Sequence, residues 1–183
     1  SYVYQISEYS DGRYYDAVAL HTYWGSNMPE AVHGTVWMSE TIEISMVDYV
    51  SQFAQGVQEL NNEPIPIWLT EVGYDEKHCA ELSAMYNLPP ENIQAIALAR
   101  VYTALLSIPN VETVFWYTYE NDTTGQTYAL KPISKEVYRI IAEALLGTTA
   151  EGISFILDSS GNPVEHFFDY RFLRPSGETG ALF

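Results

Sequence analysis

The feature that most constrains this chain is an order of segments that occurs three times. Each time a short apolar strand is followed by a long polar loop, a helical pattern and a short return. The three expected strands are residues 17–23, 65–70 and 111–117. Alternating strands and helices predict a parallel α/β sheet. In such folds a functional site lies where the strands end, and the long loops gather there.

Apolar residues at three- and four-residue spacing predict a helix after each strand, at about residues 46–60, 90–107 and 134–146. Ser45 is a plausible N-cap of the first helix, and Pro90 suits the first turn of the second. Gly147 is a typical stop for the third. The pattern therefore supplies three βα units, with long loops at 24–44, 72–88 and 119–131.

The chain after Gly147 changes character. Its β-prone segments are residues 153–157, 164–170, 170–173 and 179–183. They are separated by turn-like segments rich in Ser, Gly and Pro. We expect a short antiparallel β appendage, too small to close a sandwich by itself.

The charge balance excludes several classes of function. The 183 residues carry 24 Asp and Glu against 8 Lys and Arg, a formal net charge of −16, which argues against nucleic acid and against anionic membrane surfaces. The longest apolar run, 93–108, contains Arg100, so no membrane span is expected. Cys79 is the only cysteine and cannot form an internal disulfide. No signal peptide is visible in residues 1–16.

Each expected strand ends in side chains that do not suit a plain core. The residues are His21 and Tyr23, then Glu71 and Tyr74, then Trp116 and Tyr117. A carboxylate beside aromatic rings, a histidine and phenols is typical of a carbohydrate site. Sugar rings stack on aromatic side chains, and sugar hydroxyls form hydrogen bonds with histidine, phenols and carboxylates. A placed, ionised Glu also suits the oxocarbenium-like transition state of glycoside cleavage.

The order of these motifs resembles one group of enzymes. PIPIWLTEVGY (residues 64–74) resembles the seventh strand of retaining (β/α)₈-barrel glycoside hydrolases, the clan of cellulases, β-mannanases and β-xylosidases. DAVALHTY (16–23) resembles their sixth strand and VETVFWYTYEND (111–122) their eighth. The resemblance covers residues 14–147.

The resemblance implies a role for each residue. Glu71 would be the nucleophile. His21 and Tyr23 would contact the sugar or orient Glu71, and Trp116 would form the sugar-stacking floor. Tyr74 and Tyr117 are further expected substrate contacts. No cofactor and no metal are expected, since His78 with its acidic neighbours lacks metal-ligand spacing.

The resemblance also implies that residues 1–183 supply only part of the barrel. A TIM barrel has eight strands in about 250 residues, and this chain supplies three. We expect residues 1–147 to be the last three βα units of a partial TIM barrel, and 148–183 an appendage belonging to a truncated β-sandwich. The acid/base carboxylate of the family ends the fourth strand, so it would come from the N-terminal remainder of the barrel, in the same or another chain. The fragment alone is expected to be inactive.

Two other carboxylates are set aside as the acid/base. Asn62-Glu63-Pro64 matches the family's triplet, but Glu63 precedes Glu71 by eight residues along one strand, roughly 26 Å at ~3.3 Å per residue. A retaining pair needs carboxyl groups about 5–5.5 Å apart. Glu40 lies in an expected loop rather than at the end of an apolar strand.

Two alternatives stay open. The chain could be a non-catalytic glycan-binding or structural extracellular protein built on a barrel-derived fold. It could also be another parallel α/β enzyme with Glu71 as general base, although no phosphate loop supports this. The glycan-facing chemistry and low Lys content favour an extracellular or secreted location. The sugar and linkage are not encoded in these motifs.

Overall fold

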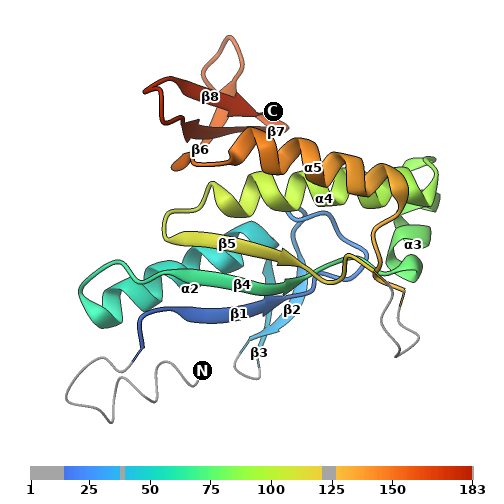
Figure 1. The fold of residues 1–183 in the computed structure, drawn as a ribbon, viewed down its shortest axis with the longest axis horizontal. Helices are drawn as coiled ribbons and strands as arrows, with labels where there is room; N and C mark the ends of the chain where they lie inside the picture. Colours follow the sequence, from blue (N-terminus) through green and yellow to red (C-terminus); the bar gives the residue numbers. More distant parts are fainter. Residues whose placement is uncertain (1–14, 38–39, 121–126, 183) are drawn as a thin grey trace.

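A computed structural model describes residues 15–37, 40–120 and 127–182. Its central sheet consists of β1 (Val18–Thr22), β4 (Ile67–Val72) and β5 (Val111–Trp116), in the order β1-β4-β5 (Figure 1). Both pairings are parallel. The three predicted strands are thus confirmed, and so is the α/β fold class.

Three helices follow these strands as the apolar spacing predicts. They are α2 (Met46–Asn61), α4 (Pro90–Leu106) and α5 (Pro132–Leu145). Ser45 caps α2 by accepting a hydrogen bond from Asp48 N at 3.0 Å, and Asn62 ends it in the left-handed conformation. The core forms where α2 and α4 cover one face of the sheet; its fully buried members include Val50, Val57, Ile67, Leu69, Leu98, Val101 and Leu105.

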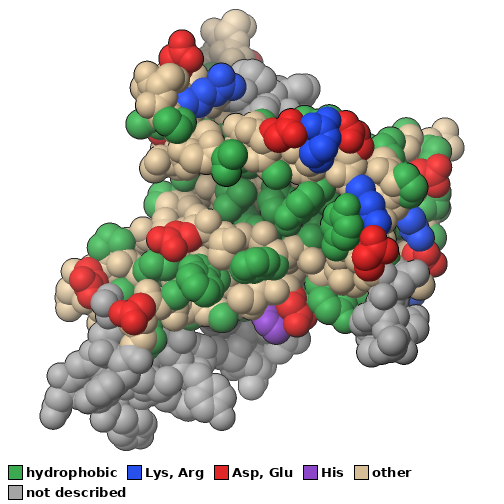
Figure 2. Space-filling model, in the orientation of Figure 1, with side chains coloured by type: hydrophobic (Ala, Val, Ile, Leu, Met, Phe, Trp, Pro, Cys, Tyr) green, Lys and Arg blue, Asp and Glu red, His purple; other side chains and the backbone are tan. Residues whose placement is uncertain are grey.

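The opposite face of the sheet is uncovered by the described residues. Trp68 of β4 is 44% exposed and Phe115 of β5 is 52% exposed. Figure 2 shows hydrophobic side chains gathered over this face. The two aromatic rings therefore lie on a side of the sheet that the described residues leave exposed.

The structure corrects the expectation of two irregular loops. The segment between β1 and α2 contains the antiparallel hairpin β2 (His33–Trp37) and β3 (Glu40–Ile44). Glu40 therefore begins a strand rather than lying in a loop. The segment after β4 contains helix α3 (Glu76–Tyr86), capped by Asp75, which accepts from His78 N at 2.7 Å.

The C-terminal residues form a separate antiparallel sheet. Its strands are β6 (Thr149–Leu157), β7 (Pro163–Leu173) and β8 (Thr179–Leu182), and it lies beyond α5 (Figure 1). The predicted appendage is present, although β7 is one continuous strand where two segments were expected. No helix in the described part of the chain has the length and apolar content to cross a membrane.

Candidate active site

An irregularity in strand pairing brings Glu71 beside His21. Leu20 of β1 pairs with Leu69 of β4, but His21 pairs with Glu71, so Thr70 is skipped. A one-residue shift moves the following side chains to the other face of a strand. Ile67 and Leu69 face the helices, and without the irregularity Glu71 would do the same. Instead the next buried residue along β4 is Val72, and the Glu71 side chain lies beside that of His21 on the open face.

Glu71 is held by two neighbours on the first strand and its extension. Tyr23 Oη donates a hydrogen bond to Glu71 Oε2 at 2.7 Å. His21 Nδ1 lies 3.5 Å from the same oxygen, a contact that becomes an ion pair when the imidazole is protonated. The Glu71 side chain is 36% exposed, so the carboxylate is both held and accessible.

The environment of Tyr23 keeps its phenol protonated. Partial burial raises its pKa well above the ordinary value, and the hydrogen bond to the Glu71 carboxylate raises it further. Tyr23 is therefore a hydrogen-bond donor at neutral pH. A neutral donor orients the carboxylate without adding a second negative charge.

Tyr128, in the loop after β5, is a site residue that the sequence reasoning missed. Its ring meets the rings of Tyr23 and Tyr117 edge-on, at centroid distances of 5.7 and 5.5 Å. Its carbonyl oxygen accepts a hydrogen bond from Trp116 Nε1 at 3.4 Å. Tyr128 thus contacts residues that follow two different strands, β1 and β5. Its neighbours in the sequence do not distinguish it from the other tyrosines.

The loop that carries Tyr128 is fastened by a buried amide of α4. Gln94 is 1% exposed; its Nε2 donates to Ala129 O at 3.1 Å and its Oε1 accepts from Lys131 N at 2.9 Å. A buried polar side chain of this kind is stable only when its hydrogen bonds are satisfied. Gln94 therefore fixes the loop that places Tyr128.

Gly73 allows the loops after β4 and β5 to approach closely. A Cβ at this position would lie 2.3 Å from Tyr117 O and 3.2 Å from Tyr128 Cδ1. Tyr117 N also donates to Val72 O at 2.8 Å, which continues the pairing of the two strands into their loops. Glycine is required here because of space rather than because of backbone conformation.

Trp116, the last residue of β5, and Tyr74, which follows β4, form a stacked pair. Their ring centroids are 6.2 Å apart and the planes differ by 20°. Tyr74 is fully buried, and its Oη donates to Asn27 O at 2.6 Å. Tyr74 thus belongs to the buried core, whereas His21 and Glu71 are partly exposed.

The remaining candidate residues do not join this group. Glu63 is exposed and precedes β4, at the opposite end of the strand from Glu71. His78 Nδ1 contacts its helix-capping neighbour Asp75 at 2.9 Å. The described residues contain no group of three His, Cys, Asp or Glu arranged to hold a metal ion.

Comparison with known proteins supports one fold. No family model matches the sequence, and no curated protein matches it. A solved structure does: a family 39 glycoside hydrolase from the gut symbiont Bacteroides cellulosilyticus WH2, with a TM-score of 0.69 and 18% identity. The match covers 97% of this chain and 35% of the glycoside hydrolase, so the chain spans about a third of its neighbour's length. The chain therefore has a glycoside hydrolase-like α/β fold.

Proposed function

We propose that this chain is the C-terminal part of a retaining glycoside hydrolase that acts on a polysaccharide or oligosaccharide. The observation that carries the proposal is the contact of Glu71 Oε2 with Tyr23 at 2.7 Å and with His21 at 3.5 Å, at the ends of two parallel strands. The glycoside hydrolase-like fold supports the same reading. The enzyme would be the full-length parent, in an extracellular or secreted location.

In this mechanism Glu71 is the nucleophile. Its carboxylate attacks the anomeric carbon, and the bond from that carbon to the glycosidic oxygen breaks. Tyr23 and His21 both contact Oε2, so we assign the attack to Oε1. A second carboxylic acid protonates the departing oxygen, and water later hydrolyses the glycosyl-enzyme with that residue acting as base.

Aromatic residues at the end of β5 would bind the sugar. Trp116, backed by Tyr74, offers a ring for the sugar to stack on, and the neighbouring Tyr117 can donate a hydrogen bond to a sugar hydroxyl. The Tyr74 Oη is occupied by the Asn27 carbonyl. Tyr74 would therefore contribute to substrate binding only by supporting the ring of Trp116.

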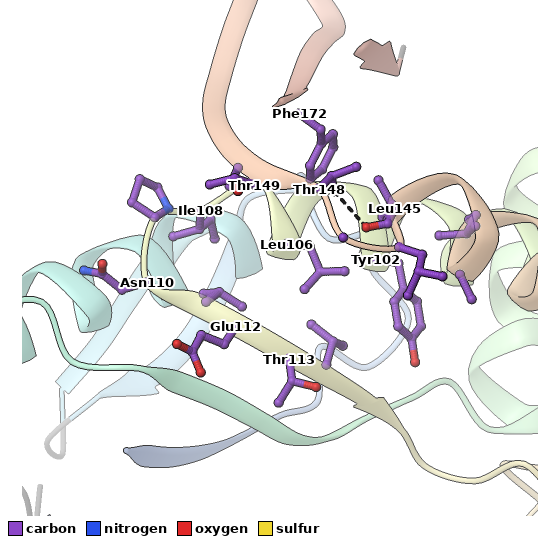
Figure 3. A pocket seen from close by; sticks show the side chains of 18 of the residues that line it. Tyr102, Leu106, Ile108, Asn110, Glu112, Thr113, Leu145, Thr148, Thr149 and Phe172 are labelled. Atoms are coloured by element: carbon purple, nitrogen blue, oxygen red, sulfur yellow. Dashed lines mark hydrogen bonds between the residues drawn. The ribbon is translucent and has the colours of Figure 1, made fainter. Parts of the chain in front are cut away.

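The acid/base residue would lie in the N-terminal remainder of the barrel, which is the partner this chain requires. Two surfaces support such a partner. One is the open sheet face that carries Trp68 and Phe115. The other is a groove of about 880 Å³ between β5, α4, α5 and the start of β6, lined by Thr113, Ile141 and Phe172 among others (Figure 3).

The groove runs along a strand edge that has no neighbour among the described residues. β5 pairs with β4 on one side only. The helix beside it, α5, has a single buried residue, Ser134, while Ile133 and Ile140 are 44% and 50% exposed. A further strand and helix placed here would pair with β5 and cover α5, as in a closed barrel.

Labelling of the parent enzyme tests the nucleophile. A mechanism-based 2-fluoroglycoside should leave a covalent sugar on the peptide that contains Glu71, detected by mass spectrometry. Glu71→Gln should abolish the label, and the matched control Glu112→Gln, on the same sheet, should keep it. A label on another carboxylate would refute the assignment. Turnover of a glycoside by purified residues 1–183 alone would refute the proposal that the acid/base lies outside this chain.

A non-catalytic glycan-binding or structural protein is the second candidate, because the exposed aromatic face could also hold a glycan without cleavage. In that case Glu71→Gln would leave affinity for oligosaccharides unchanged, and the parent would not be labelled. The sequence at the end of the parent's fourth strand separates the two: a Glu there favours an enzyme, and its absence favours binding.

A further inference from the structure

Glu30 is a buried carboxylate outside the candidate site. It follows β1, in the loop before the β2–β3 hairpin, and its side chain is 6% exposed. Arg100 of α4 places Nε 3.1 and 3.0 Å from the two carboxylate oxygens, and Nη2 2.9 Å from Oε2. A buried charge is tolerated only with such a partner.

The C-terminal sheet supplies the other contact of this carboxylate. Tyr170 of β7 is 4% exposed, and its Oη donates to Glu30 Oε1 at 2.8 Å. Burial and the charge of Glu30 raise the pKa of Tyr170, so the phenol stays protonated and keeps donating. Residues 140 positions apart thus meet at one carboxylate.

The loop that carries Glu30 also holds the stacked pair of the candidate site. Asn27, three residues earlier, accepts the hydrogen bond of Tyr74 Oη through its carbonyl oxygen at 2.6 Å. Backbone hydrogen bonds fix the loop between them, from Ala31 N to Met28 O at 2.9 Å and from Val47 N to Pro29 O at 3.2 Å. Since Tyr74 stacks on Trp116, the loop connects Glu30 with the site.

We infer that Glu30 is a positioning residue, and that the β6–β8 sheet holds the Tyr74–Trp116 pair in place through Tyr170, Glu30 and the loop after β1. The C-terminal sheet is then a support for the candidate site rather than an independent attachment. The inference rests on the proposed function only where it treats Trp116 as the sugar-stacking ring.

The test observes Trp116 directly in residues 1–183 labelled with 5-fluorotryptophan. The ¹⁹F resonance of Trp116 is assigned by its loss in Trp116→Phe. Tyr170→Phe removes only the hydroxyl that reaches Glu30, and it should shift or broaden the Trp116 resonance while leaving that of the exposed Trp68 in place. Tyr74→Phe, which breaks the link at its other end, should give the same change, and the double variant should add nothing.

Tyr15→Phe is the matched control, because its phenol also hydrogen-bonds a side chain, Asn61 Oδ1 at 3.1 Å, at the other end of the sheet. It should leave the Trp116 resonance unchanged. If Tyr170→Phe fails to fold, Glu30→Gln, which keeps the shape of the side chain, takes its place. An unchanged Trp116 resonance in the folded variant, or an equal change in Tyr15→Phe, would overturn the inference.

This readout uses no sugar and no turnover, so it is independent of the labelling of Glu71. A Trp116 response without Glu71 labelling supports the link and contradicts the hydrolase. Labelling of Glu71 without a Trp116 response supports the hydrolase and contradicts the link.

Discussion

Replacing Gly73 by alanine tests whether the candidate site depends on the close approach of two loops. The added Cβ would lie 2.3 Å from Tyr117 O, a backbone atom, whereas ordinary contacts begin at 3.4 Å. One loop must therefore move by about 1.1 Å. Moving Tyr117 also lengthens its 2.8 Å hydrogen bond to Val72 O.

The two effects give an estimate of the cost. Inserting a methyl group into a packed region costs about 1–3 kcal/mol, and the weakened hydrogen bond about 1 kcal/mol more. We expect Gly73→Ala to lower the free energy of unfolding by about 2–4 kcal/mol. For a chain of this size that corresponds to a fall of roughly 4–16 °C in Tm.

Thermal unfolding followed by circular dichroism measures this change. Gly34→Ala is the matched control, because a Cβ there meets only Thr41 Cγ2 at an ordinary 3.6 Å. Its effect should stay within about 0.5 kcal/mol. If Gly73→Ala were no less stable than Gly34→Ala, the reasoning about the close approach would be wrong.

Two further predictions concern stability alone. Burial raises the pKa of Tyr74 and Tyr170 above the ordinary value of about 10. Above that pH the unfolded chain releases protons that the folded chain keeps. The free energy of unfolding should therefore be constant below about pH 10 and fall as the pH rises further, which urea titrations at a series of pH values would measure. A urea midpoint that stays constant up to pH 11 would contradict this prediction. Ser45→Ala removes the acceptor of the 3.0 Å hydrogen bond from Asp48 N and should lower the free energy of unfolding by about 1 kcal/mol. The control Ser51→Ala, inside the same helix, should not lower it in the same urea titration.

The sequence predicted the parts of the fold in which apolar spacing is strong. β4 and β5 coincide with short apolar segments of the sequence, and α2 and α4 have apolar residues at three- and four-residue spacing that are buried in the structure. The helix α3 was missed because it buries only Cys79 and Leu82, which leaves almost no periodic signal. The hairpin was missed because only its second strand, with the alternation Thr41-Ile42-Glu43-Ile44, has a period-two pattern, whereas its first strand begins with His33-Gly34.

The candidate site was predictable as far as it lies at strand ends. His21, Tyr23 and Glu71 could be identified because parallel strands bring their ends together. The contact between His21 and Glu71 depends on the register shift at Thr70. Nothing in the sequence predicts that shift. Tyr128 could not be identified, because its position depends on a loop anchored by an amide from a distant helix.

The Glu30 cluster shows a further limit of sequence reasoning. Its members come from a loop, a helix and the C-terminal sheet. Only the fold brings the three together and buries Glu30 and Tyr170, while the Arg100 side chain stays 36% exposed. A carboxylate in a polar loop is usually solvated, so its burial could not be inferred from its neighbours.

The uncovered sheet face also governs how separate copies of this chain would behave in solution. β1 and β5 are the outer strands of the described sheet, and a strand edge beside exposed aromatic rings is a template for association with another copy. The net charge of −16 opposes this by repulsion between copies. Salt shortens the range of that repulsion, from about 10 Å at 0.1 M to about 3 Å at 1 M, and acid near the sequence pI of 4.3 removes it. Purification of the isolated chain is therefore best carried out at low ionic strength and well above that pH.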